Sequence, residues 1–304
     1  MKRIIILITV VLLFTVGCSL KDNSHNKIIV TTSFPCYDFV RAIVKNSDIE
    51  VKLLLKPGMD MHEFEPTPKD VINIEKSLLF IYVGGESDEW VNDILSSTDK
   101  KFNQTFKLID SVKLLKEELK DGMQGQEDDE IDEHVWTSPN NAIKIIESLR
   151  DKIIEIDPSN KDLYIKNANN YINEIKEVDQ EIKNIISSSN KKELIFADRF
   201  SIRYFVEDYG LNYYAAFPGC AHETEANAKT ISFLIDKVKK DDIKVVFKVE
   251  LSDGNIAKTI SEETGAKIET FQTCHNVSES DYESGVTYVD LMKRNIIVLK
   301  EALK

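Results

Sequence analysis

Residues 159–188, SNKDLYIKNANNYINEIKEVDQEIKNIISS, decide the architecture, because they form one long helical pattern between two sets of predicted strands. A helix of this length spans roughly 45 Å, and no Gly or Pro interrupts it to act as a hinge. We therefore expect a rigid linker helix that joins two lobes and lets them move little. A coiled-coil partner is the alternative, but no heptad is sustained over enough turns. The apolar positions recur at spacings of 3, 4 and 7 residues: Tyr164, Ala168, Tyr171, Ile172, Ile175, Val178, Ile182 and Ile185.

Short β-branched runs alternate with helical patterns on both sides of this helix. Such alternation predicts an α/β fold of two lobes, each a mostly parallel four-stranded sheet flanked by helices. The lobes are expected over residues 27–158 and 189–304. The predicted strands are 27–34, 51–56, 78–83 and 106–109 in the amino lobe, and 193–197, 211–217, 244–250 and 267–273 in the carboxyl lobe.

The charge of the chain favours cations as partners. Of 304 residues, 39 are Lys or Arg and 52 are Asp or Glu, a net charge of -13, so binding to nucleic-acid phosphates is not expected. An apolar fraction of 42% excludes a disordered chain. Acidic residues crowd positions 127–133, within a loop predicted over 121–133. This run is either a solvated surface segment or a weak collector of divalent cations.

The first residues predict the compartment. Met1, Lys2 and Arg3 precede an apolar core over 4–16, which is typical of a signal peptide over 1–18 and too short for a membrane-spanning helix. The end of this segment, TVGC, resembles a bacterial lipobox and implies lipidation of Cys18, followed by a polar tether over 19–26. We expect the chain to be anchored by lipid at the outer face of the bacterial cytoplasmic membrane. Plain cleavage and secretion is the alternative.

Three cysteines remain after Cys18, an odd number in an oxidising compartment. Cys220 and Cys274 both follow predicted strands of the carboxyl lobe, so either a disulfide joins them or both stay free thiols, depending on a separation that sequence alone does not establish. Cys36 follows the first strand. It either faces the cleft as a thiolate, which would favour Zn²⁺, or packs as a small apolar side chain.

Four histidines lie where ligands gather in α/β folds, whereas His25 lies in the tether. His62 (in PGMDMHEFEPTP) and His134 (in DEHVWTSPNNA) sit in strand-to-helix loops, which meet at the carboxyl edge of a parallel sheet. Imidazoles there suit Zn²⁺ or Mn²⁺, and a closed site needs further donors from the opposite lobe. The candidates are Asp198, His222, Glu223, Glu225 and His275, although a helix cap or surface role is the alternative for Glu223 and Glu225.

Over residues 27–304 the chain resembles the zinc- and manganese-binding solute-receptor lipoproteins of bacterial ABC importers. The resemblance rests on TTSFP at 31–35, HEFEPTP at 62–68, HVW at 134–136 with PNNA at 139–142, ETGAK at 263–267 and YVDLM at 288–292. It implies that His62 and His134 are the amino-lobe ligands, that the acidic run occupies the place of the family's metal-collecting loop, and that an ABC permease is the partner.

The carboxyl lobe departs from the family pattern. By resemblance the third ligand falls at or beside Arg199, which cannot bind a cation, and Asp198 is its nearest substitute. The fourth falls near His275, the only good donor there. We therefore predict a site of His62, His134 and His275, completed by His222 or Asp198. Arg199 is expected to form a salt bridge with Asp198 or a nearby Glu.

The resulting expectation is a monomeric extracytoplasmic receptor that captures Zn²⁺, or alternatively Mn²⁺, between its lobes and delivers it to a permease. Several imidazoles favour Zn²⁺, since Mn²⁺ prefers oxygen-rich shells. A metal-dependent enzyme is the competing class, but no His-Glu-x-x-His helix is present in the sequence. An adhesin-type surface lipoprotein on the same scaffold is the third interpretation, because fold alone does not fix function.

Overall fold

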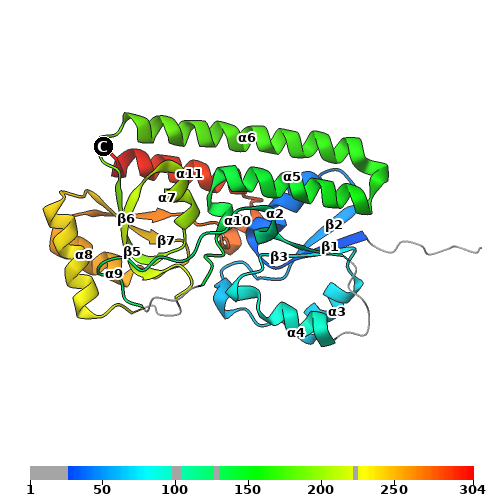
Figure 1. Ribbon diagram of the computed structural model, residues 1–304, viewed down its shortest axis with the longest axis horizontal. Coiled ribbons are helices and arrows are strands. Elements are labelled where there is room, and N and C mark those ends of the chain that lie inside the picture. The colour runs from blue at the N-terminus through cyan, green and yellow to red at the C-terminus, as the bar shows by residue number, and fades with distance from the viewer. Residues whose placement is uncertain (1–26, 98–103, 126–129, 222–224) are drawn as a thin grey trace, which may run out of the picture.

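The computed structural model describes residues 27–97, 104–125, 130–221 and 225–304. Two lobes lie side by side along the long axis, and one helix, α6, runs above both of them (Figure 1). This arrangement confirms the predicted two-lobed α/β fold. In none of the described ranges does a helix have both the length and the apolar character that crossing a bilayer requires.

The amino lobe is a parallel sheet with strand order β2-β1-β3-β4. A cluster containing Val30, Ile74 and Val91 packs α3 and α4 under one face of the sheet, while α2 and α5 lie on the other. Its strands are β1 Lys27–Thr31, β2 Ile49–Leu53, β3 Leu79–Tyr82 and β4 Thr105–Lys107, and its helices are α2 Phe34–Ile43, α3 Pro68–Lys76, α4 Trp90–Ser97 and α5 Pro139–Ile156.

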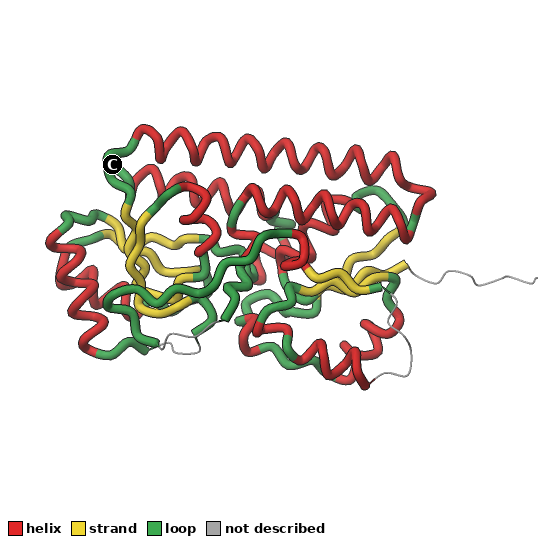
Figure 2. The backbone as a smooth tube through the Cα atoms, viewed as in Figure 1, coloured by secondary structure: helices red, strands yellow, loops and turns green. Residues whose placement is uncertain are grey.

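The carboxyl lobe repeats this design, with parallel strands in the order β6-β5-β7-β8. Successive side chains of β5 point to opposite faces: Ile195 joins the cluster under α8 and α9, whereas Phe196 joins the core toward α6. Helices lie on both faces of the sheet (Figure 2). The strands are β5 Glu193–Phe200, β6 Asn212–Pro218, β7 Val245–Val249 and β8 Lys267–Phe271, and the helices are α7 Arg203–Tyr209, α8 Ala228–Lys240, α9 Asn255–Thr264, α10 Glu279–Glu283 and α11 Tyr288–Ala302.

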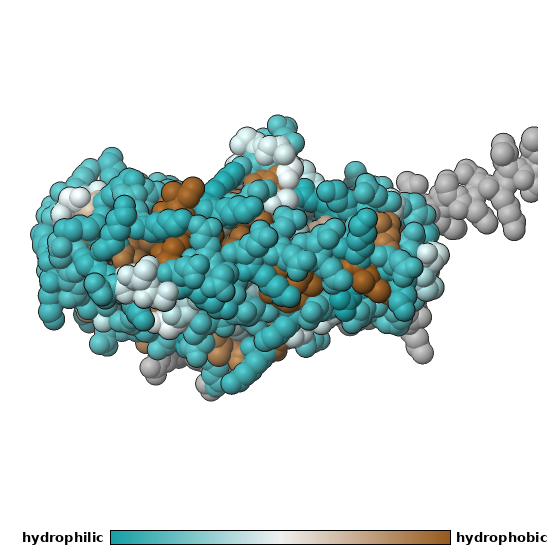
Figure 3. Space-filling view, turned by 90° about the horizontal axis from the view of Figure 1, so that it is seen from above, coloured by the Kyte–Doolittle hydropathy of each residue, from teal (hydrophilic) through white to brown (hydrophobic). Residues whose placement is uncertain are grey.

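Helix α6, Lys161–Ser188, is held by both lobes. In its amino-terminal half, the Asn167 amide donates to the carbonyl of Ile43 at 2.9 Å. In its carboxyl-terminal half, Asp179 accepts from the Tyr209 hydroxyl at 2.8 Å. One continuous apolar cluster runs from the amino-lobe sheet through α6 to the carboxyl-lobe sheet. The outer side of α6 is mainly hydrophilic (Figure 3), so its buried stripe faces the lobes.

Small boundary differences have local causes. The first strand ends at Thr31 rather than residue 34, because Pro35 stands in the first turn of α2 and Pro favours that position. The long helix begins at Lys161, since Pro158–Asn160 form a separate 3₁₀ turn before it. Helices α3 and α5 begin directly after the two histidine motifs, capped by the side chains of Thr67 and Ser138.

Candidate metal site

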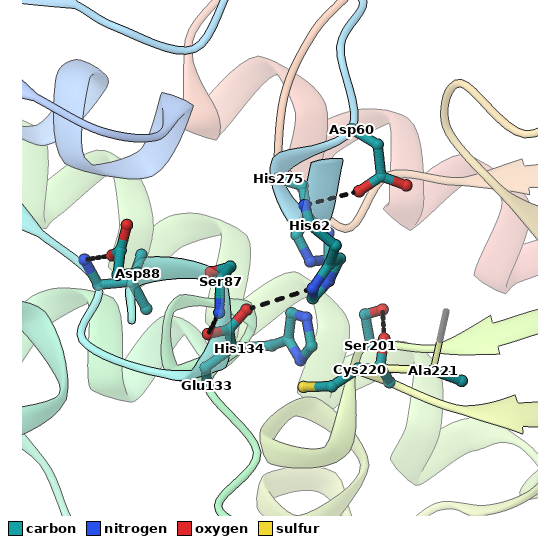
Figure 4. Close-up of polar contacts among 12 residues, drawn as sticks. Asp60, His62, Ser87, Asp88, Glu133, His134, Ser201, Cys220, Ala221 and His275 are labelled. Atoms are coloured by element: carbon teal, nitrogen blue, oxygen red, sulfur yellow. Dashed lines mark hydrogen bonds and ion pairs between the residues drawn. The ribbon is translucent and has the colours of Figure 1, made fainter. Parts of the chain in front are cut away.

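Three histidines from three loops and both lobes meet in the middle of the molecule (Figure 4). His62 lies in a 3₁₀ turn between β2 and α3, His134 precedes the turn before α5, and His275 follows β8. One ring nitrogen of each lies within 4.8 Å of those of the other two. Their ring centroids are 4.4 to 6.0 Å apart. The loops at the carboxyl ends of parallel strands thus bring the three imidazoles together.

His134 is fully buried and its ring is oriented by Asp132. Asp132 Oδ1 accepts from the His134 backbone N–H at 2.8 Å and lies 2.9 Å from ring Nδ1. This contact places the ring proton on Nδ1 and leaves the lone pair of Nε2 for a cation. Burial by itself would lower the pKa of His134, but the carboxylates of Asp132, Glu133 and Glu117 raise it above its ordinary value. The buried Nε2 has no hydrogen-bond partner.

His275 is oriented by a relay through Thr273 to Glu250. The Thr273 hydroxyl donates to Glu250 Oε1 at 2.7 Å, and its oxygen lies 2.5 Å from His275 Nδ1. The ring proton therefore occupies Nδ1, and the buried Nε2 is left without a partner. Burial, then the neighbouring His134 and His62, lower the pKa of His275 well below its ordinary value. The ring is accordingly neutral, the form that binds metals.

The His275 loop is fastened to the amino lobe on either side of the histidine. The Asn276 amide donates to the carbonyls of Lys56 and Met59, at 2.7 and 2.8 Å, in the loop that leads to His62. On the other side, Trp136 Nε1 donates to the carbonyl of Thr273 at 2.9 Å. The carboxyl-lobe imidazole is therefore held in place by the lobe that carries the other two.

Two acidic residues of the predicted loop belong to the interior. Asp132 and Glu133 are 1% and 0% exposed, so the interpretation of the whole run as a solvated or loosely collecting segment is wrong for these two positions. Burial raises the pKa of Glu133 to about 7. One Glu133 oxygen accepts from the Ser87 backbone at 3.1 Å, and the other, 3.8 Å from His62 Nδ1, has no hydrogen-bond partner. Residues 126–129 lie outside the described ranges.

Room for Glu133 depends on a glycine. A Cβ at Gly85 would lie 2.2 Å from the Cβ of Glu133, far inside van der Waals contact. Gly219 has a similar effect at the end of β6, where a Cβ would lie 3.1 Å from Cε1 of His134. The absence of these two side chains lets three segments approach each other closely.

The structure contradicts a disulfide between Cys220 and Cys274. Both are buried free thiols, as is Cys36. Cys220 lies beside Glu117, Asp132 and Glu133, whose charges add to burial in raising its pKa. Cys274 lies elsewhere, with Sγ 3.8 Å from the carbonyl of Gln272. Cys36 is fully buried against Ser33, and burial raises its pKa to about 12, which favours the apolar interpretation of that residue.

Of the remaining carboxyl-lobe candidates, the two that the structure describes, Asp198 and Glu225, do not join the histidine cluster. Asp198 uses both oxygens on backbone N–H groups, of Arg199 at 2.9 Å and Val249 at 3.2 Å. The Arg199 side chain pairs with Asp60 of the amino lobe. The prediction that it pairs with Asp198 or a nearby Glu is therefore wrong. Glu225 is exposed, and His222 and Glu223 lie outside the described residues.

A cavity of about 370 Å³ borders the cluster on the carboxyl-lobe side. His62, His275, Arg199 and Asp60 line it, together with Glu250. The Arg199 guanidinium lowers the pKa of Asp60, although burial opposes this, so Asp60 is ionised. Sequence reasoning missed Asp60, Glu250 and the inward position of Glu133. For Asp60 and Glu133 the one signal in the sequence was that they lie close to His62 and His134 along the chain.

A two-lobed α/β chain with a buried histidine cluster between its lobes has the architecture of metal-binding proteins that serve metal uptake. The model of the family described as zinc-uptake complex component A, periplasmic (ZnuA), matches residues 29–302. This chain belongs to that family. The family and its relatives are described as metal-uptake components and not as enzymes, in agreement with the expectation from the sequence.

Individual relatives support this assignment. The chain is 32% identical to the zinc-binding lipoprotein AdcA of Streptococcus pneumoniae R6 over 99% of its own length, and spans 61% of that relative. It is 31% identical to the high-affinity zinc uptake system protein ZnuA of Bacillus subtilis, over 93% of this chain and 89% of the relative. The Zn(II)-bound ZnuA-like domain of S. pneumoniae AdcA superimposes with a TM-score of 0.77 at 29% identity, over 91% of this chain and 99% of that one.

Proposed function

We propose that this protein is the extracytoplasmic receptor of an ABC importer, that it captures Zn²⁺ between its lobes, and that it delivers the ion to a membrane permease. One observation carries the proposal: His62, His134 and His275 come from both lobes and place donor nitrogens within 4.8 Å of one another. Tetrahedral Zn²⁺ accepts nitrogen donors at about 2.0–2.1 Å, which requires such proximity. Two similar proteins support this cargo: the AdcA domain was solved with Zn(II) bound, and the B. subtilis relative is named as a zinc uptake protein.

The surroundings favour a divalent cation as cargo. Asp132 and Glu133 are buried beside the histidines, and Glu250 is half-buried there. Asp132 contacts Nδ1 of His134, and Glu250 is linked to Nδ1 of His275 through the Thr273 hydroxyl. Imidazoles oriented in this way favour Zn²⁺ over Mn²⁺, which prefers an oxygen-rich shell. Mn²⁺ remains the second cation to be tested.

The arrangement of the lobes bears on how the receptor responds to metal. Helix α6 and the contacts of Asn276 hold both lobes in one body, so we expect metal binding to order loops around the site more than to rotate the lobes. We further propose that Cys18 carries the lipid anchor at the outer face of the cytoplasmic membrane and that the receptor is a monomer. The word lipoprotein in the name of the S. pneumoniae relative supports the anchor.

Calorimetric titration of the metal-free full chain, extracted in detergent, tests the cargo. We expect one tight Zn²⁺ site per chain, weaker binding of Mn²⁺, and loss of tight binding in His62→Ala. His25→Ala is the matched control, because we place that histidine in the proposed tether, outside the described residues, and it should bind like wild type. If neither cation binds saturably to the wild type, the proposed function is wrong.

A further inference from the structure

A second group of donor atoms lies beside the three histidines. One oxygen of Glu133, one ring nitrogen of His134 and the sulfur of Cys220 lie within 4.8 Å of one another, and all three residues are buried. The Cys220 sulfur points toward Glu133 and His134 (Figure 4). The segment that carries it reaches His134 because Gly219 has no side chain to collide with the imidazole.

Two atoms of this group are buried without a hydrogen-bond partner. They are Oε1 of Glu133 and Nε2 of His134, each on a side chain with no exposed surface. Leaving such atoms unpartnered is unfavourable, and more so for a charged group. A buried cysteine is commonly a small apolar filler, but Cys220 is not in apolar surroundings: its backbone N–H donates to Glu117 Oε1 at 2.7 Å, and Asp132 and Glu133 lie nearby.

We propose that Cys220 and Glu133 bind the transported cation, so that His134 is shared between a three-histidine donor set and a thiolate-containing one. This inference rests on the proposed function. The Nε2 lone pair of His134 can bind only one cation at a time, because Asp132 holds Nδ1. The two sets therefore serve the same ion, and one cation is bound per chain.

The chemistry of this set selects zinc. When the Zn–S bond forms, the thiol proton passes to solvent, and thiolate, imidazole and carboxylate are all ordinary zinc ligands. Mn²⁺ gains little from a soft thiolate. Cys220 therefore favours Zn²⁺ over Mn²⁺. It does so from the carboxyl lobe, in which Arg199 occupies the position where the family resemblance places a ligand.

Titration with Co²⁺ reads sulfur coordination directly, because a cobalt–thiolate bond gives an intense near-ultraviolet charge-transfer band that histidine and carboxylate ligands do not. In the metal-free full chain we expect this band to saturate at one equivalent of Co²⁺. Cys220→Ser should lose the band but keep the visible d–d bands, since the histidines remain. Cys274→Ser is the matched control and should keep both.

The failure of this inference is distinct from failure of the proposed function. Co²⁺ that binds the wild type with d–d bands but no charge-transfer band, or a band that persists in Cys220→Ser, overturns the thiolate ligand and leaves the receptor intact. If the wild type shows no cobalt bands and also binds neither Zn²⁺ nor Mn²⁺ saturably by calorimetry, the receptor itself is overturned. In competition assays, Cys220→Ser should lower zinc affinity on the order of tenfold, with little change for manganese. An equal loss for both metals contradicts the selective role.

Discussion

The two lobes have the same strand order, β2-β1-β3-β4 and β6-β5-β7-β8, yet they furnish the site unequally. The amino lobe contributes His62 and His134, and it encloses them with carboxylates from their own loops. The carboxyl lobe contributes His275 to the histidine cluster and presents Arg199, which pairs with Asp60 across the cleft. Loops at strand ends can thus carry different chemistry on two sheets of the same topology.

Removal of His134 should have the largest effect on the unequal contributions of the two lobes. His134→Ala should reduce zinc affinity more than His275→Ala, because His134 belongs to both donor groups and His275 to only one. We expect a loss larger than the about 10- to 100-fold typical of an outer partner. Competition against a chromophoric chelator measures both variants. Equal losses would show that the lobes contribute equally.

The next largest effect concerns the orientation of His134. Asp132→Asn keeps the shape but lets an amide face Nδ1, so the imidazole is no longer held in one tautomer by a carboxylate. Zinc affinity should fall about 10- to 100-fold by calorimetry. Asp121→Asn, at an exposed position of the same loop, serves as the control and should have no effect.

Replacement of Arg199 sharpens the contrast between the lobes. Arg199→His adds a neutral donor beside the cavity, and zinc affinity should rise about tenfold, which corresponds to about 1.4 kcal/mol. Arg199→Ala removes the pair with Asp60 without adding a donor, and it should not tighten binding. If both variants bind alike in the chelator competition, position 199 does not face the cation.

The smallest effect is the pH dependence of the metal-free protein. Burial raises the pKa of Glu133 to about 7 and that of Asp88 to about 6, both in the amino lobe. Carboxyls with raised folded-state pKa values stabilise the fold at low pH, and this stability is lost as pH rises through those values. The melting temperature should therefore fall by a few degrees between about pH 5 and pH 7.5. Glu133→Gln should flatten this slope, and an unchanged slope would contradict the assignment.

The periodicity of apolar residues predicted the fold. The rule that ligands gather at the carboxyl ends of parallel strands predicted that three histidines meet. The eight strands and α6 follow from alternating apolar runs, and His62, His134 and His275 were placed at sheet edges by the strands before them. Parallel sheets bring such edges together whatever the loops contain.

The surroundings of the histidines could not be predicted, because they depend on how loops that are far apart in the chain cross. Glu133 reads in the sequence as one of many exposed acids, yet it turns inward beside Gly85, 48 residues earlier in the chain. Arg199 finds Asp60 rather than an acid of its own lobe for the same reason. Cys220 and Cys274 are not joined, because β6 and β8, the strands that they follow, lie at opposite edges of the carboxyl-lobe sheet.

Helix α6 also limits how this chain can be divided or exchanged in evolution. Its amino-terminal half is buried against one lobe, through residues such as Tyr164 and Asn167, and its carboxyl-terminal half against the other, through Asp179 and Ile182. If the chain were cut at either end of the helix, one fragment would keep α6 with half of its buried face exposed. The other fragment would lose the helix that covers it. We therefore expect the lobes to be inherited as a pair, and recombination between relatives to be tolerated within surface loops rather than at the junction between the lobes.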